Sequence, residues 1–166
     1  MSELRHVVHT FLPVISENTT VLLLGSVPSV KSMEQGFYYM HKQNRFWKVM
    51  SLLLGEDLYN SPIENRIEVL KRVGIGLYDA VEECDIQGSS DNKIYNVVPT
   101  DLEKLIKGTK VKAIFCLGDK SYLIATKNNA TLKGILKKLP STSPANAKMS
   151  LENLVKEFQV VLDYLE

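Results

Sequence analysis

Asn44 is the residue whose type and surroundings point most directly to chemistry. It opens the segment 44–47 (NRFW), and the aromatic run 37–39 (FYY) and His41 come shortly before it. An asparagine amide cannot take up a proton near neutral pH, so it would orient water or substrate by hydrogen bonds. Neighbouring aromatic rings offer a surface on which a planar ligand can stack. The structural alternatives are a helix N-cap at Asn44 and an aromatic plug in the core.

A second group of candidate residues lies in the loop 139–146 (LPSTSPAN). Its hydroxyl groups and backbone N–H groups match phosphate oxygens, and its two prolines make it rigid. The segment 133–148 contains four lysines and no acidic residue. The segment 31–48 contains four basic residues and His41 but only one acidic residue. One face would then be locally positive, although 20 basic and 19 acidic residues give a net charge of only +1. The alternative is a proline-stiffened turn with solvated lysines.

Short apolar runs that alternate with helical segments must position these loops. The sequence predicts strands, buried on both faces, over 21–25, 75–81, 111–117 and 136–139. Capping residues and apolar spacing predict helices over about 46–53, 61–74, 100–108 and 150–162. Strands separated by helices favour a parallel sheet, and ligands bind beyond the carboxyl ends of such strands. The candidate loops, together with Asp79 and 117–119, should therefore meet at one edge of the sheet.

The N-terminal segment is predicted to be a helix over about 3–11. Leu4, Val7, Val8 and Phe11 have helical spacing there. His6 and His9 would then lie on a solvated face, because two histidines alone rarely form a metal site.

Composition excludes several classes of protein. The chain has 166 residues, 45% of them hydrophobic and 23% charged, which is ordinary for one globular domain. No apolar run is long enough to span a bilayer, and the first ten residues lack the apolar core of a signal peptide, so we expect a soluble, intracellular protein. Cys84 and Cys116 are far apart, which argues against an iron–sulfur cluster or a zinc site. The loop 25–29 matches neither phosphate-loop nor dinucleotide-binding spacing.

Three motifs in this order resemble those of the uracil-DNA glycosylase superfamily. They are GSVPSVKSMEQGFYYMHKQNRFWKVM (25–50), GLYDAVEECDIQGSSD (76–91) and LPSTSPANA (139–147), each after a predicted strand. They look most like the hypoxanthine-DNA glycosylase branch and more distantly like the mismatch-specific uracil/thymine-DNA glycosylases. The likeness runs from about 21 to 147. It implies a single domain over 1–166: a three-layer α/β sandwich with a short four-stranded parallel sheet flanked by helices.

The resemblance also implies an activity. Such enzymes flip a deaminated base, here hypoxanthine and/or uracil, out of DNA and hydrolyse its N-glycosidic bond. They leave an abasic site for base excision repair. We therefore expect a monofunctional glycosylase that needs no cofactor and no metal, binds DNA but no membrane, is a monomer, and is cytoplasmic and associated with the nucleoid.

The resemblance implies a role for each matching residue. Asn44 would orient the attacking water. Base-pocket residues would be Ser26 and Val27 through their backbone, and Tyr39, Phe46 and Phe37 through their rings, with Tyr38 in reserve. Ser141, Thr142 and Ser143 would grip phosphates, Ala145 and Asn146 would enter the vacated stack, and Arg45 and His41 would contact DNA.

Three departures from the family pattern leave alternatives open. Val27 stands where many members carry Asp or Asn, Leu139 where the uracil enzymes carry His, and Leu117 where the hypoxanthine branch often carries Asn. A catalytically weak or inactive DNA-binding module of the same fold is therefore the first alternative. A small-molecule nucleosidase or nucleotide-binding protein is the second, and it would show little salt dependence.

Overall fold

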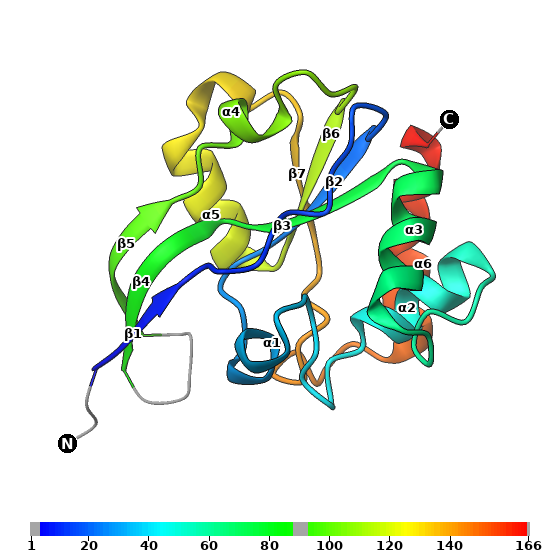
Figure 1. The fold of residues 1–166 in the computed structure, drawn as a ribbon, viewed down its shortest axis with the longest axis horizontal. Helices are drawn as coiled ribbons and strands as arrows, with labels where there is room; N and C mark the ends of the chain where they lie inside the picture. The colour runs from blue at the N-terminus through cyan, green and yellow to red at the C-terminus, as the bar shows by residue number, and fades with distance from the viewer. Residues whose placement is uncertain (1–3, 88–92, 166) are drawn as a thin grey trace.

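The central element is a parallel sheet of four strands. The computed structural model describes residues 4–87 and 93–165, so Gly88–Asp91 of the second motif lie outside the described part. The strands are β2 (Val21–Gly25), β3 (Ile75–Asp79), β6 (Ala113–Leu117) and β7 (Leu136–Leu139), and they lie in the order β3-β2-β6-β7. This confirms the predicted α/β architecture, which Figure 1 shows with helices on both sides of the sheet.

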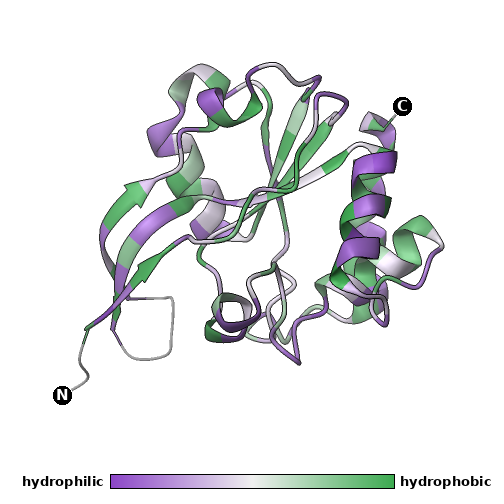
Figure 2. Ribbon diagram, in the orientation of Figure 1, coloured by the Kyte–Doolittle hydropathy of each residue, from purple (hydrophilic) through white to green (hydrophobic). Residues whose placement is uncertain are grey.

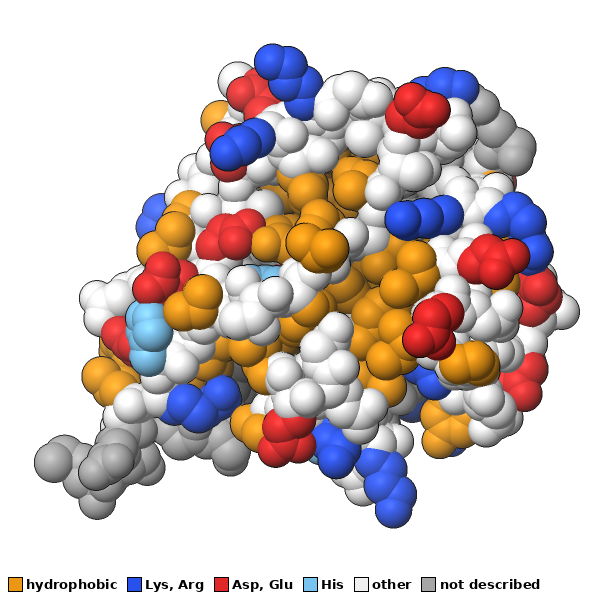
Figure 3. All heavy atoms as spheres, viewed as in Figure 1, with side chains coloured by type: hydrophobic (Ala, Val, Ile, Leu, Met, Phe, Trp, Pro, Cys, Tyr) orange, Lys and Arg blue, Asp and Glu red, His pale blue; other side chains and the backbone are white. Residues whose placement is uncertain are grey.

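Continuous burial explains why these segments are strands. Every residue of β2, β3 and β6 is buried, as expected for parallel strands that are covered on both faces. Figure 2 shows these strands as mostly hydrophobic, whereas hydrophilic and hydrophobic residues are mixed along helices such as α3. Figure 3, seen from the same side as Figure 1, shows hydrophobic side chains gathered over the middle of the molecule, with charged side chains around them.

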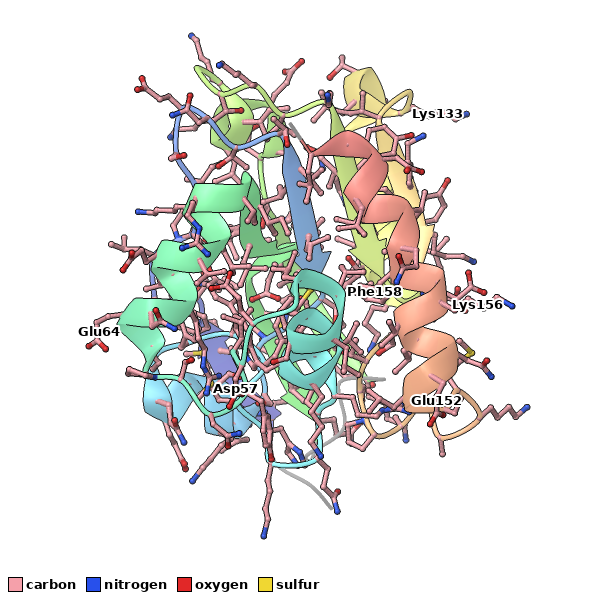
Figure 4. The ribbon with its side chains drawn as sticks, turned by 90° about the vertical axis from the view of Figure 1, so that its right-hand side faces the viewer. Asp57, Glu64, Lys133, Glu152, Lys156 and Phe158 are labelled. Carbon is pink, nitrogen blue, oxygen red and sulfur yellow. The ribbon has the colours of Figure 1, made fainter. Side chains whose placement is uncertain are left out.

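Helices cover both faces of the sheet. α2 (Phe46–Leu54), α3 (Ile63–Val73) and α6 (Leu151–Phe158) lie on one face, and α4 (Leu102–Ile106) and α5 (Asp119–Asn128) on the other. Figure 4 shows Glu64 of α3 and Lys156 of α6 on the outside of this helical layer. The remaining helical segments are α1 (Val30–Gln35), η1 (Ala130–Leu132) and η2 (Gln159–Tyr164). None of the helices in 4–87 and 93–165 is long and apolar enough to cross a membrane.

The N-terminal segment corrects one prediction, because it is a strand and not a helix. β1 (Leu4–Val8) pairs antiparallel with β4 (Val81–Gln87), which also pairs with β5 (Ile94–Pro99) in a second sheet. Its apolar residues have helical spacing, but backbone pairing with a distant strand decides its conformation. His6 is held between Glu83 and Asp85, at 2.8 and 2.7 Å, and these hydrogen bonds raise its pKa, with Asp85 contributing most. The His6 side chain is 56% exposed, as predicted, whereas the His9 side chain is 1% exposed and therefore not solvated.

Replacing Leu23 with Ala tests the role of the central strand. Leu23 in β2 is completely buried, so we expect the Leu23→Ala variant to lose about 2–5 kcal/mol of unfolding free energy through lost burial and a cavity. Leu52→Ala on the exposed side of α2, where the residue is 61% exposed, should change it by less than about 0.5 kcal/mol. Urea denaturation measures both, and equal losses would contradict this account of the core.

Candidate active site

A cavity of about 540 Å³ lies at the carboxyl edge of the parallel sheet. Its walls come from segments distant in sequence: residues 25–32 after β2, Asp79 at the end of β3, Leu117 at the end of β6, and 141–145 after β7. It is also lined by Tyr38, Tyr39, His41 and Asn44, from the segment before α2, and by Arg5, Phe11 and Ile86. The segments expected to meet at this edge therefore do meet, because parallel strands end on the same side.

Asn44 is half-buried at this cavity and is held by its carbonyl oxygen. Oδ1 accepts a hydrogen bond from the backbone N–H of Phe46 at 2.9 Å and another from the Thr142 hydroxyl at 2.8 Å. A backbone N–H can only donate, so the contact with Phe46 fixes which end of the amide carries oxygen. Asn44 thus makes a cap-like contact at the start of α2 and also lines the cavity. The NH₂ group is the end left for a ligand, and it acts as a donor.

Arg45 ties the segment before α2 to the loop after β7. Its guanidinium donates to the carbonyl oxygens of Met149, Ser143 and Asn146, the last at 2.9 Å, and its backbone N–H donates to the Thr142 carbonyl. The sequence predicted a DNA contact for Arg45, whereas the structure uses this guanidinium inside the protein. Its position fixes the loop after β7 beside Asn44.

The aromatic residues divide between the cavity wall and the core. Tyr39 lines the cavity, and its ring stacks on Phe46 with centroids 4.0 Å apart. Phe46 is completely buried behind Tyr39, and Phe37 is stacked on Trp47 at 5.6 Å. Phe37 and Phe46 therefore form the plug that the sequence left as an alternative, and this corrects their prediction as base-pocket residues. Tyr39 has φ +57°, a backbone conformation that is costly for an aromatic residue and is common at ligand sites.

Asp79 and His9 form a buried pair at this cavity. Nε2 of His9 lies 2.8 Å from Oδ2 of Asp79, and their side chains are 1% and 5% exposed. Burial raises the pKa of the Asp79 carboxyl group, and the hydrogen bond with His9 acts against this rise. The sequence predicts Asp79 at the sheet edge but indicates no role for it. Its partner His9 is 70 positions away and carries no local signal of this contact.

Gly25 lets Asp79 and Tyr39 approach the end of β2. A Cβ atom on Gly25 would overlap Oδ1 of Asp79 and would lie 2.9 Å from the Tyr39 hydroxyl oxygen. That hydroxyl is buried without a hydrogen-bond partner among the described residues, and burial raises its pKa well above the usual value. The end of the cavity beside Gly25 therefore contains a buried hydroxyl group that the described residues leave without a hydrogen bond.

The loop after β7 arranges its hydroxyl groups as donors. The Ser141 hydroxyl oxygen accepts from the Ser143 N–H, and the Ser143 hydroxyl oxygen accepts from the Ala145 N–H, so each O–H remains to donate. Thr142 differs, because it is 2% exposed and donates to Asn44. It is thus placed as a positioning residue, in contrast to its predicted phosphate contact. The Asn146 amide donates to the Ser141 carbonyl, and Ala145 is exposed.

Other predicted residues fall at the rim of the cavity. Ser26 and Val27 line it through the loop after β2, and exposed His41 lies at its edge. Leu139 is buried at the end of β7. Within the described residues, no group of three or more His, Cys, Asp or Glu side chains could hold a metal ion.

Comparison with known proteins identifies the family. The model of the uracil DNA glycosylase superfamily matches residues 12–166. The chain belongs to this superfamily. A protein of Methanosarcina acetivorans named hypoxanthine DNA glycosylase is 32% identical over 154 residues, covering 91% of this chain and 95% of that protein. A protein of Methanosarcina barkeri with the same name is 44% identical over 84 residues, and the match spans about half of each chain, 51% and 53%.

A solved structure supports the superfamily fold. The solution NMR structure of a candidate uracil DNA glycosylase from Methanosarcina acetivorans has a TM-score of 0.78 with this chain. It is 33% identical in sequence, and the match covers 92% of this chain and 94% of that one. The cavity therefore lies at the carboxyl edge of the sheet in a protein with the fold of the uracil DNA glycosylase superfamily.

Replacing Gly25 with Ala tests the close approach at the cavity. The added methyl group would displace Asp79 or Tyr39, so we expect a loss of about 1–3 kcal/mol in unfolding free energy together with weaker ligand binding. Gly134→Ala is the control, because a Cβ atom there would meet nothing within 4 Å. Denaturant unfolding measures the first effect, and a Gly25→Ala protein as stable as wild type would contradict the proposed crowding.

Proposed function

We propose that the protein is a DNA glycosylase that removes deaminated bases, hypoxanthine first among them, and leaves an abasic site. Its relatives named hypoxanthine DNA glycosylase support this activity. The observation that carries the proposal is the cavity at the sheet edge, which combines the donor end of the Asn44 amide, one aromatic wall and a buried carboxylate. The base would be extruded from the duplex to enter this cavity.

Tyr39 would form the stacking wall. Phe46 covers one face of its ring, so the other face is the one that a base would meet. The hydroxyl groups of Ser141 and Ser143 would hold the DNA backbone, and Ala145 and Asn146 would enter the vacated stack. This division follows the predicted roles, except that Phe37 and Phe46 lie behind the wall and that Thr142 and Arg45 position other groups.

Asn44 would act by donation. Because its oxygen is held by Phe46 and Thr142, its NH₂ group would hold the oxygen of the attacking water or an acceptor of the leaving base. The glycosidic bond would break largely before water attacks, so fixed dipoles would do most of the catalysis. No proton transfer to Asn44 is required.

Asp79 would select the base by accepting a hydrogen bond from an N–H group of the base ring. Deamination replaces an acceptor ring nitrogen and an exocyclic amine with a ring N–H and a carbonyl group, the pattern shared by hypoxanthine and uracil. His9 holds Oδ2, so Oδ1 is the oxygen that would accept the ring N–H. Adenine presents a lone pair at the same ring position and would be repelled by the carboxylate.

Replacing Asn44 separates its catalytic and capping roles. We expect Asn44→Ala to lower single-turnover base release from deoxyinosine DNA by about 100-fold or more, the usual loss for a positioned polar group. It should also cost about 1 kcal/mol of stability, because Oδ1 caps the Phe46 N–H.

Ser150→Ala is the matched control for this experiment. Ser150 caps α6 by accepting from the Asn153 N–H, and it does not line the cavity. It should lose similar stability and keep its activity. If both variants release base at the wild-type rate, Asn44 is a cap only.

Replacing Asp79 with Asn tests base selection. His9 would hold the amide oxygen, so the NH₂ group would face the ring N–H, and we expect kcat/KM on deoxyinosine DNA to fall by about 10–100-fold. In wild type, kcat/KM should fall as pH decreases through the raised pKa of Asp79, because the protonated carboxyl group no longer accepts. This acid limb should be missing in Asp79→Asn and present in the exposed control Asp163→Asn.

A non-catalytic DNA-binding module is the other candidate. Val27 and Leu117 place apolar side chains at the cavity where relatives of the predicted family carry polar ones. Binding of deoxyinosine DNA by wild type without release of any base would favour the module.

A further inference from the structure

A second cavity adjoins the first, and Asn44 lines both. It has a volume of about 270 Å³ and shares Tyr39, His41 and Asn44 with the first cavity. Its remaining wall is made by Met40, Lys42, Trp47, Tyr59, Asn60 and Arg66. No carboxylate from the described residues lines it, whereas two permanent cations do, so its chemistry favours an anion.

Arg66 is the unusual residue of this cavity. It lies in α3 and is 8% exposed, yet no described carboxylate is within ion-pair distance of its guanidinium. Buried arginines are normally paired with an acid, because desolvating an unpaired charge is costly. Here that cost lowers the pKa of the Arg66 guanidinium. The charge of Asp57 acts against this lowering, but the Asp57 carboxylate accepts hydrogen bonds from the backbone and side-chain N–H groups of Asn60.

The contacts of Arg66 hold the guanidinium in place without neutralising it. It donates to the carbonyl oxygens of Ser61 and Tyr59 at 3.0 and 2.9 Å and to the Met40 sulfur at 3.6 Å. It also lies 4.9 Å from the centroid of the Trp47 ring. These three hydrogen bonds use three of its five N–H donors, so two remain for a ligand.

The position of this cavity selects the anion. Asn44 lines both cavities, whereas Ser141–Ser143 line only the first and Arg66 only the second. A strand that places one nucleotide in the base cavity has phosphates on both sides of that nucleotide. The serine hydroxyl groups in the first cavity and Arg66 in the adjoining one would then each be placed to reach one of these two phosphates.

We propose that Arg66, with Lys42, binds a backbone phosphate of the DNA strand that carries the damaged base. This inference rests on the proposed function, because it uses the base cavity to place the strand. A guanidinium fixed by protein carbonyls binds phosphate at little entropic cost, since its geometry is set before binding. Holding phosphates on both sides would keep the sugar of the extruded nucleotide beside Asn44.

DNA binding by an Arg66→Gln variant tests the proposal. The probe is a duplex with one 2′-fluoro-deoxyinosine, which resists hydrolysis, and its affinity is measured by fluorescence anisotropy between 50 and 200 mM salt. A plot of log affinity against log salt has a negative slope, and we expect the variant's slope to be shallower by about 0.9, the value for one phosphate contact. Lys71→Gln, at the other end of α3 and exposed, is the control and should keep the wild-type slope.

Single methylphosphonates locate the phosphate. A neutral methylphosphonate is placed in turn at each phosphate near the lesion. At one of these positions, the methylphosphonate should lower the affinity of wild type about tenfold and should leave the affinity of Arg66→Gln unchanged. An unchanged salt slope, or equal losses by both proteins at every position, would overturn the proposal. Inorganic phosphate is titrated alone: saturable binding at Arg66 with no methylphosphonate effect would assign the cavity to a free anion and overturn the DNA assignment.

Two further measurements keep the outcome clear. Thermal unfolding shows whether Arg66→Gln is folded. If it is not, Lys42→Gln, an exposed position, provides the same salt slope and methylphosphonate readouts, with a smaller expected loss. Base release from ordinary deoxyinosine DNA is measured in parallel. If wild type releases no base, the proposed function is refuted. If wild type releases base but no methylphosphonate position depends on Arg66, only this inference is refuted.

Discussion

The close contact of Gly25 with Asp79 and Tyr39 is the constraint on which the site depends. β2 is paired on both sides, with β3 and with β6, so its end cannot move without breaking the sheet. Only a residue without a Cβ atom lets the carboxylate and the phenol approach it. The unfavourable features of the site are a buried carboxylate and a hydroxyl group without a hydrogen-bond partner in the described part of the chain, and both are held beside this doubly paired strand.

A second set of contacts joins the two halves of the cavity. The Thr142 hydroxyl reaches the Asn44 amide, and Arg45 reaches three carbonyl groups of the following loop. These residues are about 100 positions apart in sequence. Because Arg45 and Thr142 are occupied in this way, they position other groups. The residues that contact the DNA directly would then be Asn44, Tyr39, Asp79, Ser141 and Ser143.

The two cavities suggest a division of tasks around Asn44. The first has an aromatic wall and polar atoms beside Gly25, which suits a base, and the second has a buried cation, which suits a phosphate. Asn44 lines both, and its carbonyl oxygen is fixed by contacts within the protein. Fixed dipoles between two binding sites cost little reorganisation during a reaction. This arrangement needs no titrating side chain at the position of Asn44.

The sequence by itself determined the parallel sheet, the helices around it and the edge where the candidate loops meet. Continuous apolar runs and helix caps are local signals, and parallel strands must end on one side. Tertiary structure alone decided the rest. β1 is a strand because it pairs with β4, Phe37 and Phe46 lie behind Tyr39, and His9 binds Asp79 across 70 residues. Such contacts depend on which surfaces meet after folding, and residue type and spacing do not encode them locally.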